Sequence, residues 1–307
     1  MRMSSGNGFS DFFYPSRDGL RLHARVYGEP VAGRWPVVCL AGLTRNARDF
    51  HDLALFLSQR AATPRQVVCF DYRGRGESQR DDDSANYTVA VEAEDILAGL
   101  AGLGISEGCF IGTSRGGLIV HLIGAVQPAL LKAIVFNDIG PAIEPAGLEH
   151  IRAYLDPAPV PKPFRAVVES LRAVHRTDFP ALDDRDWQSM ALALYRDDGT
   201  GRFIPDFDAK LVQTLAGLDL TKPLPALWPQ FDALARVPMM VVRGENSRLL
   251  SAGTVDEMAR RHAALRVVTV RGQGHAPFLE TGALPQTIAA FFDEAGSGNQ
   301  AEGGTAA

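Results

Sequence analysis

Short apolar segments alternate with amphipathic segments along most of the chain. The apolar segments are rich in Val, Ile, Leu and Phe, which is typical of strands buried on both faces of a sheet. They lie at 36–40, 66–70, 108–111, 133–136, 239–242 and 266–270. The segments between them predict helices at 47–60, 89–103, 116–126, 254–262 and 284–294. This alternation predicts an α/β fold, in which helices cover both faces of a mostly parallel sheet.

Two segments near the N-terminus depart from this alternation. Residues 11–15 and 20–27 are joined by the turn sequence Arg17-Asp18-Gly19 and predict an antiparallel hairpin at the sheet edge. Residues 1–8 are polar and Gly/Ser-rich, which predicts a flexible N-terminus without the apolar region of a secretory signal. The small polar residues 296–307 predict a disordered tail.

The alternation stops after Pro141 and resumes near residue 236. The stretch 142–235 has helical patterning, aromatic residues and several prolines, but no segment typical of a buried strand. We therefore predict a helical cap at 142–235, inserted into a core formed by residues 9–141 and 236–295.

Composition and charge narrow the function classes. The chain has 307 residues, a net charge of -5 and no cluster of Lys and Arg, so we expect no nucleic-acid partner. No apolar run reaches the roughly 18 residues of a membrane span, so no membrane association is expected and a cytoplasmic location is the default. Its three cysteines, Cys39, Cys69 and Cys109, each fall in a predicted strand and are expected to be reduced core thiols. We expect no metal site.

The sequence Gly112-Thr113-Ser114-Arg115-Gly116 lies between a predicted strand and a predicted helix. This strand-turn-helix setting holds a serine on a strained turn with its hydroxyl exposed, and the glycines let strand and helix pass closely. Ser114 is therefore the predicted nucleophile. A serine hydroxyl needs a base to take its proton. Of seven histidines, His275 is the leading candidate, because it follows the last predicted strand on a loop that can reach the carboxyl edge of the sheet.

In combination, several segments closely resemble the α/β-hydrolase superfamily over roughly residues 9 to 295. They are Asp18-Gly19-Leu20-Arg21-Leu22-His23, Leu40-Ala41-Gly42-Leu43, Asp71-Tyr72-Arg73-Gly74-Arg75-Gly76-Glu77-Ser78, the turn at Ser114, and Gly272-Gln273-Gly274-His275. The resemblance implies an α/β-hydrolase fold and the chain order Ser, acid, His. It also implies that Arg73 and Arg75 brace neighbouring loops.

The same resemblance implies an oxyanion hole made by the backbone N–H groups of Leu43 and Arg115. The loop at Leu43 usually reads His-Gly in this family and here reads Ala41-Gly42-Leu43. The substitution removes a supporting side chain but leaves the backbone donor.

The sequence offers more than one position for the acid of the triad. The family's common position follows the seventh strand in a Gly-x-x-Asp turn, and here that turn ends in Ser247. The loop after the sixth strand contains Asp138, and its Asp-Ile-x-Pro sequence resembles a subset of esterases with the acid on this earlier strand. We predict Asp138 as the acid, with Glu245 as the alternative and Ser247 as a possible helper.

These residues predict an esterase that forms an acyl-enzyme, needs no cofactor and acts on a small-molecule ester or lactone. The alternatives are a lactonase or enol-lactonase, a carbon–carbon bond hydrolase on the same triad, and a non-catalytic ligand-binding relative. Aromatic residues of the cap are candidates for the substrate pocket. They are Trp187, Tyr195, Phe207, Trp228 and Phe231. The sequence leaves the oligomeric state open.

Overall fold

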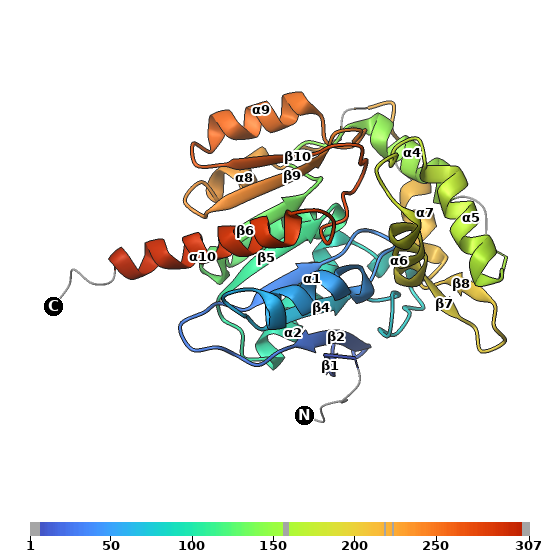
Figure 1. Cartoon of the computed structure of the whole chain (residues 1–307), viewed down its shortest axis with the longest axis horizontal. Coiled ribbons are helices and arrows are strands. Elements are labelled where there is room, and N and C mark those ends of the chain that lie inside the picture. Colours follow the sequence, from blue (N-terminus) through green and yellow to red (C-terminus); the bar gives the residue numbers. More distant parts are fainter. Residues whose placement is uncertain (1–6, 156–159, 218, 223, 303–307) are drawn as a thin grey trace.

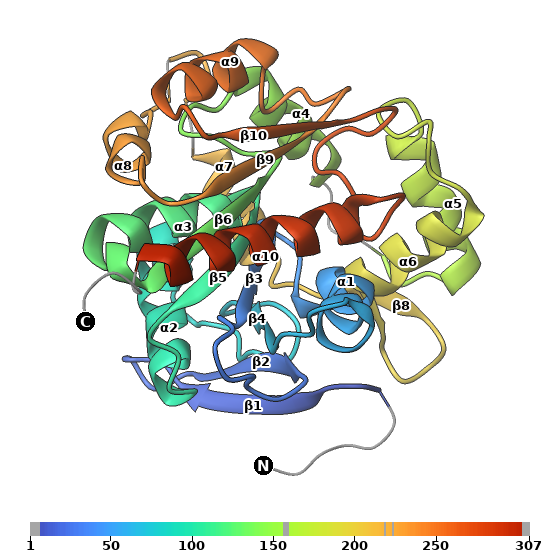
Figure 2. The ribbon, with the colours of Figure 1, turned by 60° about the vertical axis from the view of Figure 1, so that its left-hand side comes forward.

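An eight-stranded sheet runs through the centre of the molecule (Figure 1, Figure 2). The computed structural model describes residues 7–155, 160–217, 219–222 and 224–302. In spatial order the strands are β1 (Ser10–Pro15), β2 (Arg21–Tyr27), β4 (Val67–Asp71), β3 (Val37–Leu40), β5 (Gly108–Thr113), β6 (Leu131–Asn137), β9 (Met239–Gly244) and β10 (Arg266–Val270). Strand β2 pairs antiparallel with β1 and with β4, and the pairings from β4 to β10 are parallel. The α/β-hydrolase fold, with its edge hairpin, is confirmed.

Alternate side chains of the strands enter two apolar cores, one on each face of the sheet. On β3, Val38 and Leu40 belong to one core, and Val37 and Cys39 to the other. The first core is covered by α2 (Val89–Gly102), α3 (Arg115–Val126), α8 (Trp228–Ala233) and α9 (Ala252–Arg261). The second is covered by η1 (Ala47–Phe50), α1 (His51–Leu55), η2 (Phe56–Arg60) and α10 (Leu284–Glu302). The three cysteines are free and buried in this second core, as predicted.

Two helices differ from their predicted form. The helix predicted at 47–60 is a composite of a 3₁₀ turn, a short α-helix and a π-helical turn. Helix α10 continues through Glu302, past the predicted start of a disordered tail at residue 296. The prediction rested on the small, polar character of these terminal residues, but extending an existing helix costs far less than nucleating one. Residues 303–307 and 1–6 of the predicted flexible ends lie outside the described residues.

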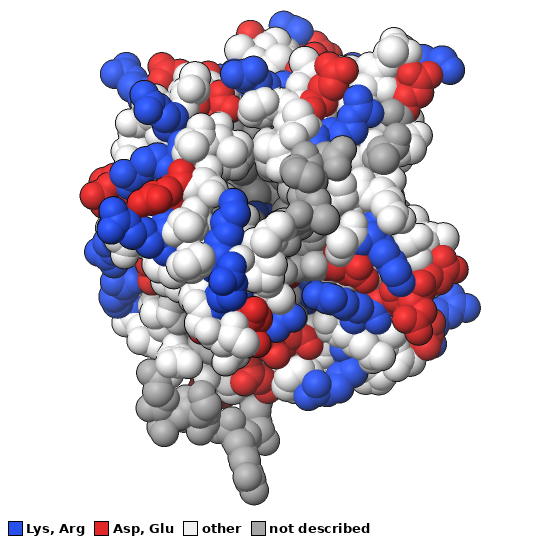
Figure 3. All heavy atoms as spheres, turned by 90° about the vertical axis from the view of Figure 1, so that its right-hand side faces the viewer, with Lys and Arg blue, Asp and Glu red and all other residues white. Residues whose placement is uncertain are grey.

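The segment between β6 and α8 lies over the carboxyl ends of the strands (Figure 1). Its elements are α4 (Pro145–Leu155), α5 (Phe164–His175), α6 (Asp184–Leu194), the hairpin β7 (Tyr195–Asp197) and β8 (Phe203–Pro205), and α7 (Lys210–Ala216). Short 3₁₀ turns lie outside it at η3 (Ser84–Asn86) and η4 (Pro128–Leu130). Charged side chains of both signs are intermixed on this face of the molecule, which is hollowed near its centre (Figure 3).

The cap ends earlier than predicted. The N–H of Leu227 donates to the carbonyl of Pro141 at 2.7 Å, so the two ends of the insertion meet there. Helix α8, which follows, contributes Phe231 to the first core and packs against α3. The sequence of α8 is compatible with a helix of the cap or a helix of the core, and its packing partner distinguishes these two positions. We therefore place the end of the cap near residue 227 rather than 235.

Candidate active site

Ser114 occupies a sharp turn between β5 and α3. Its backbone has φ 51° and ψ -115°, a region that non-glycine residues rarely adopt. A Cβ on Gly116 would lie 2.1 Å from the carbonyl oxygen of Leu40, and one on Gly112 would lie 2.7 Å from the Cα of Gly117. Both glycines are therefore required for the close passage of strand and helix, as the sequence predicted.

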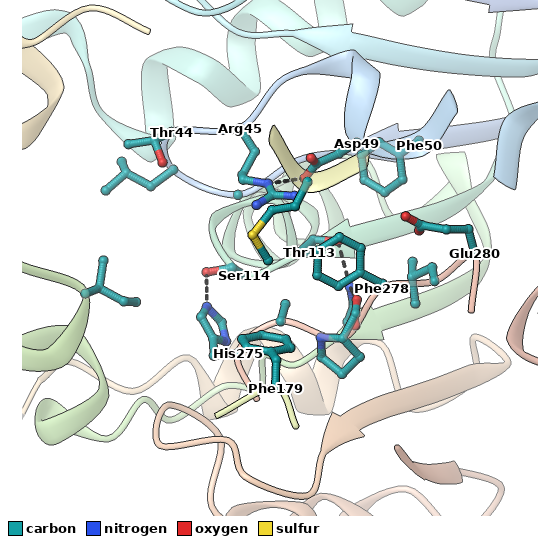
Figure 4. A pocket seen from close by; sticks show the side chains of 18 of the residues that line it. Thr44, Arg45, Asp49, Phe50, Thr113, Ser114, Phe179, His275, Phe278 and Glu280 are labelled. Atoms are coloured by element: carbon teal, nitrogen blue, oxygen red, sulfur yellow. Dashed lines mark hydrogen bonds and ion pairs between the residues drawn. The ribbon is translucent and has the colours of Figure 1, made fainter. Parts of the chain in front are cut away.

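His275 connects Ser114 to Asp138. Its Nε2 lies 2.8 Å from the Ser114 Oγ, and its Nδ1 lies 2.8 Å from Asp138 Oδ2. The loop that carries His275 is fixed by Asn137, whose side chain donates to the carbonyl of Pro277 at 3.0 Å. The structure thus brings together the three residues that the sequence placed on three different loops (Figure 4 shows the Ser114–His275 bond).

Asp138 is fully buried and held from several sides. Its backbone φ is 55°, and within the described residues Ser114 and Asp138 are the two non-glycine residues with positive φ. Its Oδ1 accepts the N–H of Gly244 at 2.8 Å, and its Oδ2 accepts the hydroxyl of Ser247 at 2.5 Å. A carboxylate with these donors stays oriented toward the ring of His275.

The alternative acid, Glu245, is placed differently. Its side chain is exposed, and its carboxylate accepts the N–H of Gly272 at 2.8 Å. It therefore holds the start of the loop that carries His275 and does not contact the ring. Ser247, the predicted helper, contacts Asp138 and not the histidine.

One buried carboxylate braces both residues of the predicted oxyanion hole. Arg75 donates from Nε to the carbonyl of Leu43 at 2.8 Å and from Nη1 to Glu92 at 2.7 Å. Arg115 donates from Nε to the other oxygen of Glu92 at 2.5 Å. Glu92 is fully buried. Because Arg115 is the first residue of α3, its N–H has no acceptor within the helix and is free to bind an oxyanion.

Ser114 lies between two cavities. The smaller, about 100 Å³, contains His275 in its wall and ends at the polar side chains Arg45, Asp49 and Glu280. The larger is a cleft of about 720 Å³ beneath the cap, and Leu43 and Arg115 line it together with Ser114. Most of its wall is apolar. It includes Leu118, Leu122, Ile139, Ile143, Leu148 and Leu227.

Comparison with known proteins identifies the family to which this fold belongs. A model of the alpha/beta hydrolase family matches residues 37–289. The chain belongs to the α/β-hydrolase family. It is 31% identical over 272 residues to a 3-hydroxybutyrate-oligomer hydrolase of Cupriavidus necator, covering 83% of this chain and 88% of that protein. It is 28% identical over 234 residues to a 2-(acetamidomethylene)succinate hydrolase of Mesorhizobium japonicum, covering 76% and 79%.

A solved structure is also closely similar. It is the crystal structure of an α/β hydrolase from Novosphingobium aromaticivorans, with a TM-score of 0.86 and 37% identity, covering 93% of this chain and 98% of that one. The activities named for the two relatives by sequence are both hydrolytic. These findings support hydrolase activity for this member of the α/β-hydrolase family.

None of the five predicted pocket residues lines either cavity at Ser114. Trp187 is buried in the apolar cluster inside the cap. Phe231 is buried in the first core, and the ring of Trp228 packs edge-on against the ring of Phe231. Tyr195 and Phe207 line a third cavity, which shares Thr44 and Arg45 with the small cavity. Large aromatic side chains are buried more often than they line a pocket, and the sequence alone does not separate the two cases.

The sequence interpretation missed three polar groups beside the site. Glu92, like Asp95, is an acid on the buried face of a mostly apolar helix, a placement that requires a charged partner. Arg45 and Asp49 lie four residues apart, directly after the loop of Leu43, a spacing at which the side chains of a helical segment meet. Both signals were present in the sequence.

Neither metal binding nor membrane crossing finds support in the described parts of the chain. No three His, Cys, Asp or Glu side chains there gather closely enough to hold a metal ion. None of the helices described is both long and apolar enough to cross a membrane.

Proposed function

We propose that the protein is a serine hydrolase that cleaves carboxylic esters, with Ser114 as nucleophile, His275 as base and Asp138 as the acid of the triad. The observation that carries this proposal is the position of His275, which contacts Ser114 through one ring nitrogen and Asp138 through the other. A relative of similar length is named as a hydrolase of 3-hydroxybutyrate oligomers, whose units are joined by ester bonds.

The reaction follows from this arrangement. Ser114 Oγ attacks the ester carbonyl while its proton passes to Nε2 of His275, and the N–H groups of Leu43 and Arg115 stabilise the oxyanion. The carbon–oxygen bond then breaks, and the imidazolium gives its proton to the leaving alcohol. Water, deprotonated by His275, attacks the acyl-enzyme and releases the carboxylic acid and Ser114. Asp138 keeps Nδ1 protonated and stabilises the imidazolium.

The test is labelling and hydrolysis by matched variants. Parent protein should react with a fluorophosphonate probe and hydrolyse p-nitrophenyl butyrate, and Ser114→Ala should lose both activities. Ser251→Ala is the control, because Ser251 caps α9 and lies outside both cavities. A parent that resists the probe, or a Ser114→Ala variant with parental hydrolysis, would exclude the proposal.

A further inference from the structure

The small cavity beside His275 ends in an ion pair with unused hydrogen-bonding capacity. Arg45 Nε donates to Asp49 Oδ2 at 2.5 Å, and the two side chains are 24% and 10% exposed. Within the described residues, the two terminal nitrogens of Arg45 have no hydrogen-bond acceptor. In Figure 4 the pair lies across the cavity from His275, and Glu280 lies beyond Phe278.

Asp49 contributes an unused acceptor to the same place. Its Oδ1 is buried and has no hydrogen-bond donor among the described residues. A buried carboxylate oxygen without a donor is rare in native proteins and costs stability until a donor reaches it. Arg45, with its free donors, and Asp49, with its free acceptor, both line the cavity that also contains Ser114.

The charges in this end of the cavity balance near neutral pH. Arg45 and Asp49 neutralise each other. Burial, with the charge of Asp49 as a further cause, raises the pKa of Glu280 to about 8, so its carboxyl is largely uncharged at pH 7. An anionic or cationic ligand would leave a net charge in a confined space, whereas a neutral group that donates and accepts matches the free atoms.

The position of His275 indicates which half of an ester enters this cavity. The imidazolium must give its proton to the leaving alcohol, so the alcohol portion lies on the side of His275. His275 lines the small cavity and not the apolar cleft, Arg115 lines the cleft and not the small cavity, and Leu43 and Ser114 line both. The acyl chain therefore fits the cleft, and the alcohol portion fits the small cavity.

We propose that Arg45 and Asp49 form a subsite for a free hydroxyl on the alcohol portion of the substrate. Arg45 donates to the hydroxyl oxygen, and the hydroxyl donates to Asp49 Oδ1. The preferred substrates are then monoesters of diols or polyols. This inference rests on the proposed ester hydrolysis and adds the substrate class to it.

The experiment compares hydroxyalkyl and alkyl butyrates of equal chain length. The pairs are 2-hydroxyethyl with propyl butyrate, 3-hydroxypropyl with butyl butyrate, and 4-hydroxybutyl with pentyl butyrate. For at least one pair, kcat/KM of the parent should favour the hydroxyl by about tenfold or more, as expected for hydrogen bonds to charged groups. Arg45→Met should remove most of this preference, as should Arg45→Met/Asp49→Leu, which avoids leaving an unpaired buried carboxylate. Arg60→Met, on an exposed side chain outside both cavities, should retain it.

A binding measurement separates this inference from the proposed function. Ser114→Ala should bind 3-hydroxypropyl butyrate more tightly than butyl butyrate in a ligand-observed NMR titration, and added Arg45→Met should equalise the two. If the enzyme hydrolyses both kinds of ester but neither kcat/KM nor binding favours the hydroxyalkyl esters over the alkyl esters, the proposed subsite is wrong and the esterase proposal stands. If 3-carboxypropyl butyrate is preferred over both 3-hydroxypropyl and butyl butyrate, and this preference depends on Arg45, the site binds an anion and the hydroxyl subsite is wrong. If no ester is hydrolysed, the esterase proposal fails, and the binding result alone decides the subsite.

Discussion

Ser247 donates its hydroxyl to Asp138 Oδ2 at 2.5 Å, and the same oxygen lies 2.8 Å from Nδ1 of His275. Ser247 ends the turn after β9, where many members of the family carry their acid. Asp138 follows β6, which is the direct neighbour of β9 in the sheet. The carboxyl ends of the two strands therefore meet at one histidine, so the acid can come from either strand.

This arrangement predicts unequal effects at the two positions. Asp138→Asn should lower kcat by about 10³- to 10⁴-fold, because the amide favours the wrong tautomer of His275. Ser247→Ala should lower kcat by about tenfold or less, since it removes a single hydrogen bond from the carboxylate. Hydrolysis of p-nitrophenyl butyrate by purified, folded variants measures both effects.

Glu245→Gln provides the control, because its side chain contacts Gly272 and not His275. A large loss of kcat in Glu245→Gln with little loss in Asp138→Asn would reverse the assignment of the acid. In addition, Asp138→Asn/Ser247→Asp should recover part of the lost activity, because the new carboxylate would occupy the family's common position.

Arg75 links the carbonyl of Leu43 to Glu92, and we predict that it controls the oxyanion hole. Arg75→Lys keeps a positive charge near Glu92 but loses the forked donor that reaches both acceptors. The Leu43 loop should then become less ordered, and kcat should fall by about ten- to 100-fold with little change in KM, because a misplaced donor weakens mainly the transition state.

Arg73→Lys tests whether such an effect is specific. Arg73 is almost fully buried and pairs with Asp18, Asp81 and Asp95, none of which lines a cavity at Ser114. Its variant should lose stability in urea unfolding but keep the kcat of the folded enzyme. Equal losses of kcat in both variants would mean that Arg75 acts only on stability.

Local sequence patterns predicted most of the fold, because parallel strands buried on both faces leave continuous apolar segments in the sequence. The turn at Ser114 was predictable for a related reason. Its glycines are required by contacts with Leu40 and Gly117, one of them only a few residues away. His275 followed from the last strand, since the ends of parallel strands share one edge of the sheet.

Features that depend on a distant partner were not predictable in the same way. The patterning of α8 allowed either a cap or a core position, and its contact with α3 decided between them. Trp187 and Phe231 are buried in two different clusters although both are aromatic residues of one predicted cap. Glu92 obtains its role from two arginines on other elements, which become its neighbours only in the folded chain.

The apolar cleft should set the length of the acyl chain that the enzyme accepts. Leu122 lines the cleft from α3, so Leu122→Trp should shorten it and lower kcat/KM for p-nitrophenyl octanoate by about tenfold or more. Hydrolysis of the acetate should change little. Val126→Trp is the matched control, because Val126 lies one turn further along α3 and is 67% exposed. Equal effects of both tryptophans on the octanoate would contradict this role of the cleft.

His121 should make the fold sensitive to acid. Its ring is fully buried, donates from Nδ1 to the carbonyl of Gly117 at 2.7 Å and stacks on Phe136, and burial lowers its pKa from 6.5 to about 4. Between pH 6.5 and about pH 4 this histidine is protonated in the unfolded chain but neutral in the folded chain. The free energy of unfolding therefore falls across this window as the pH is lowered. His121→Leu should remove on the order of 2 kcal/mol of that loss between pH 7 and 4.5, measured by urea unfolding at both values. Ile123→Val, a non-titrating change in the same helix, should lower the free energy of unfolding equally at both pH values. If the free energy of unfolding of His121→Leu falls with pH as steeply as that of the parent, another group causes the acid sensitivity.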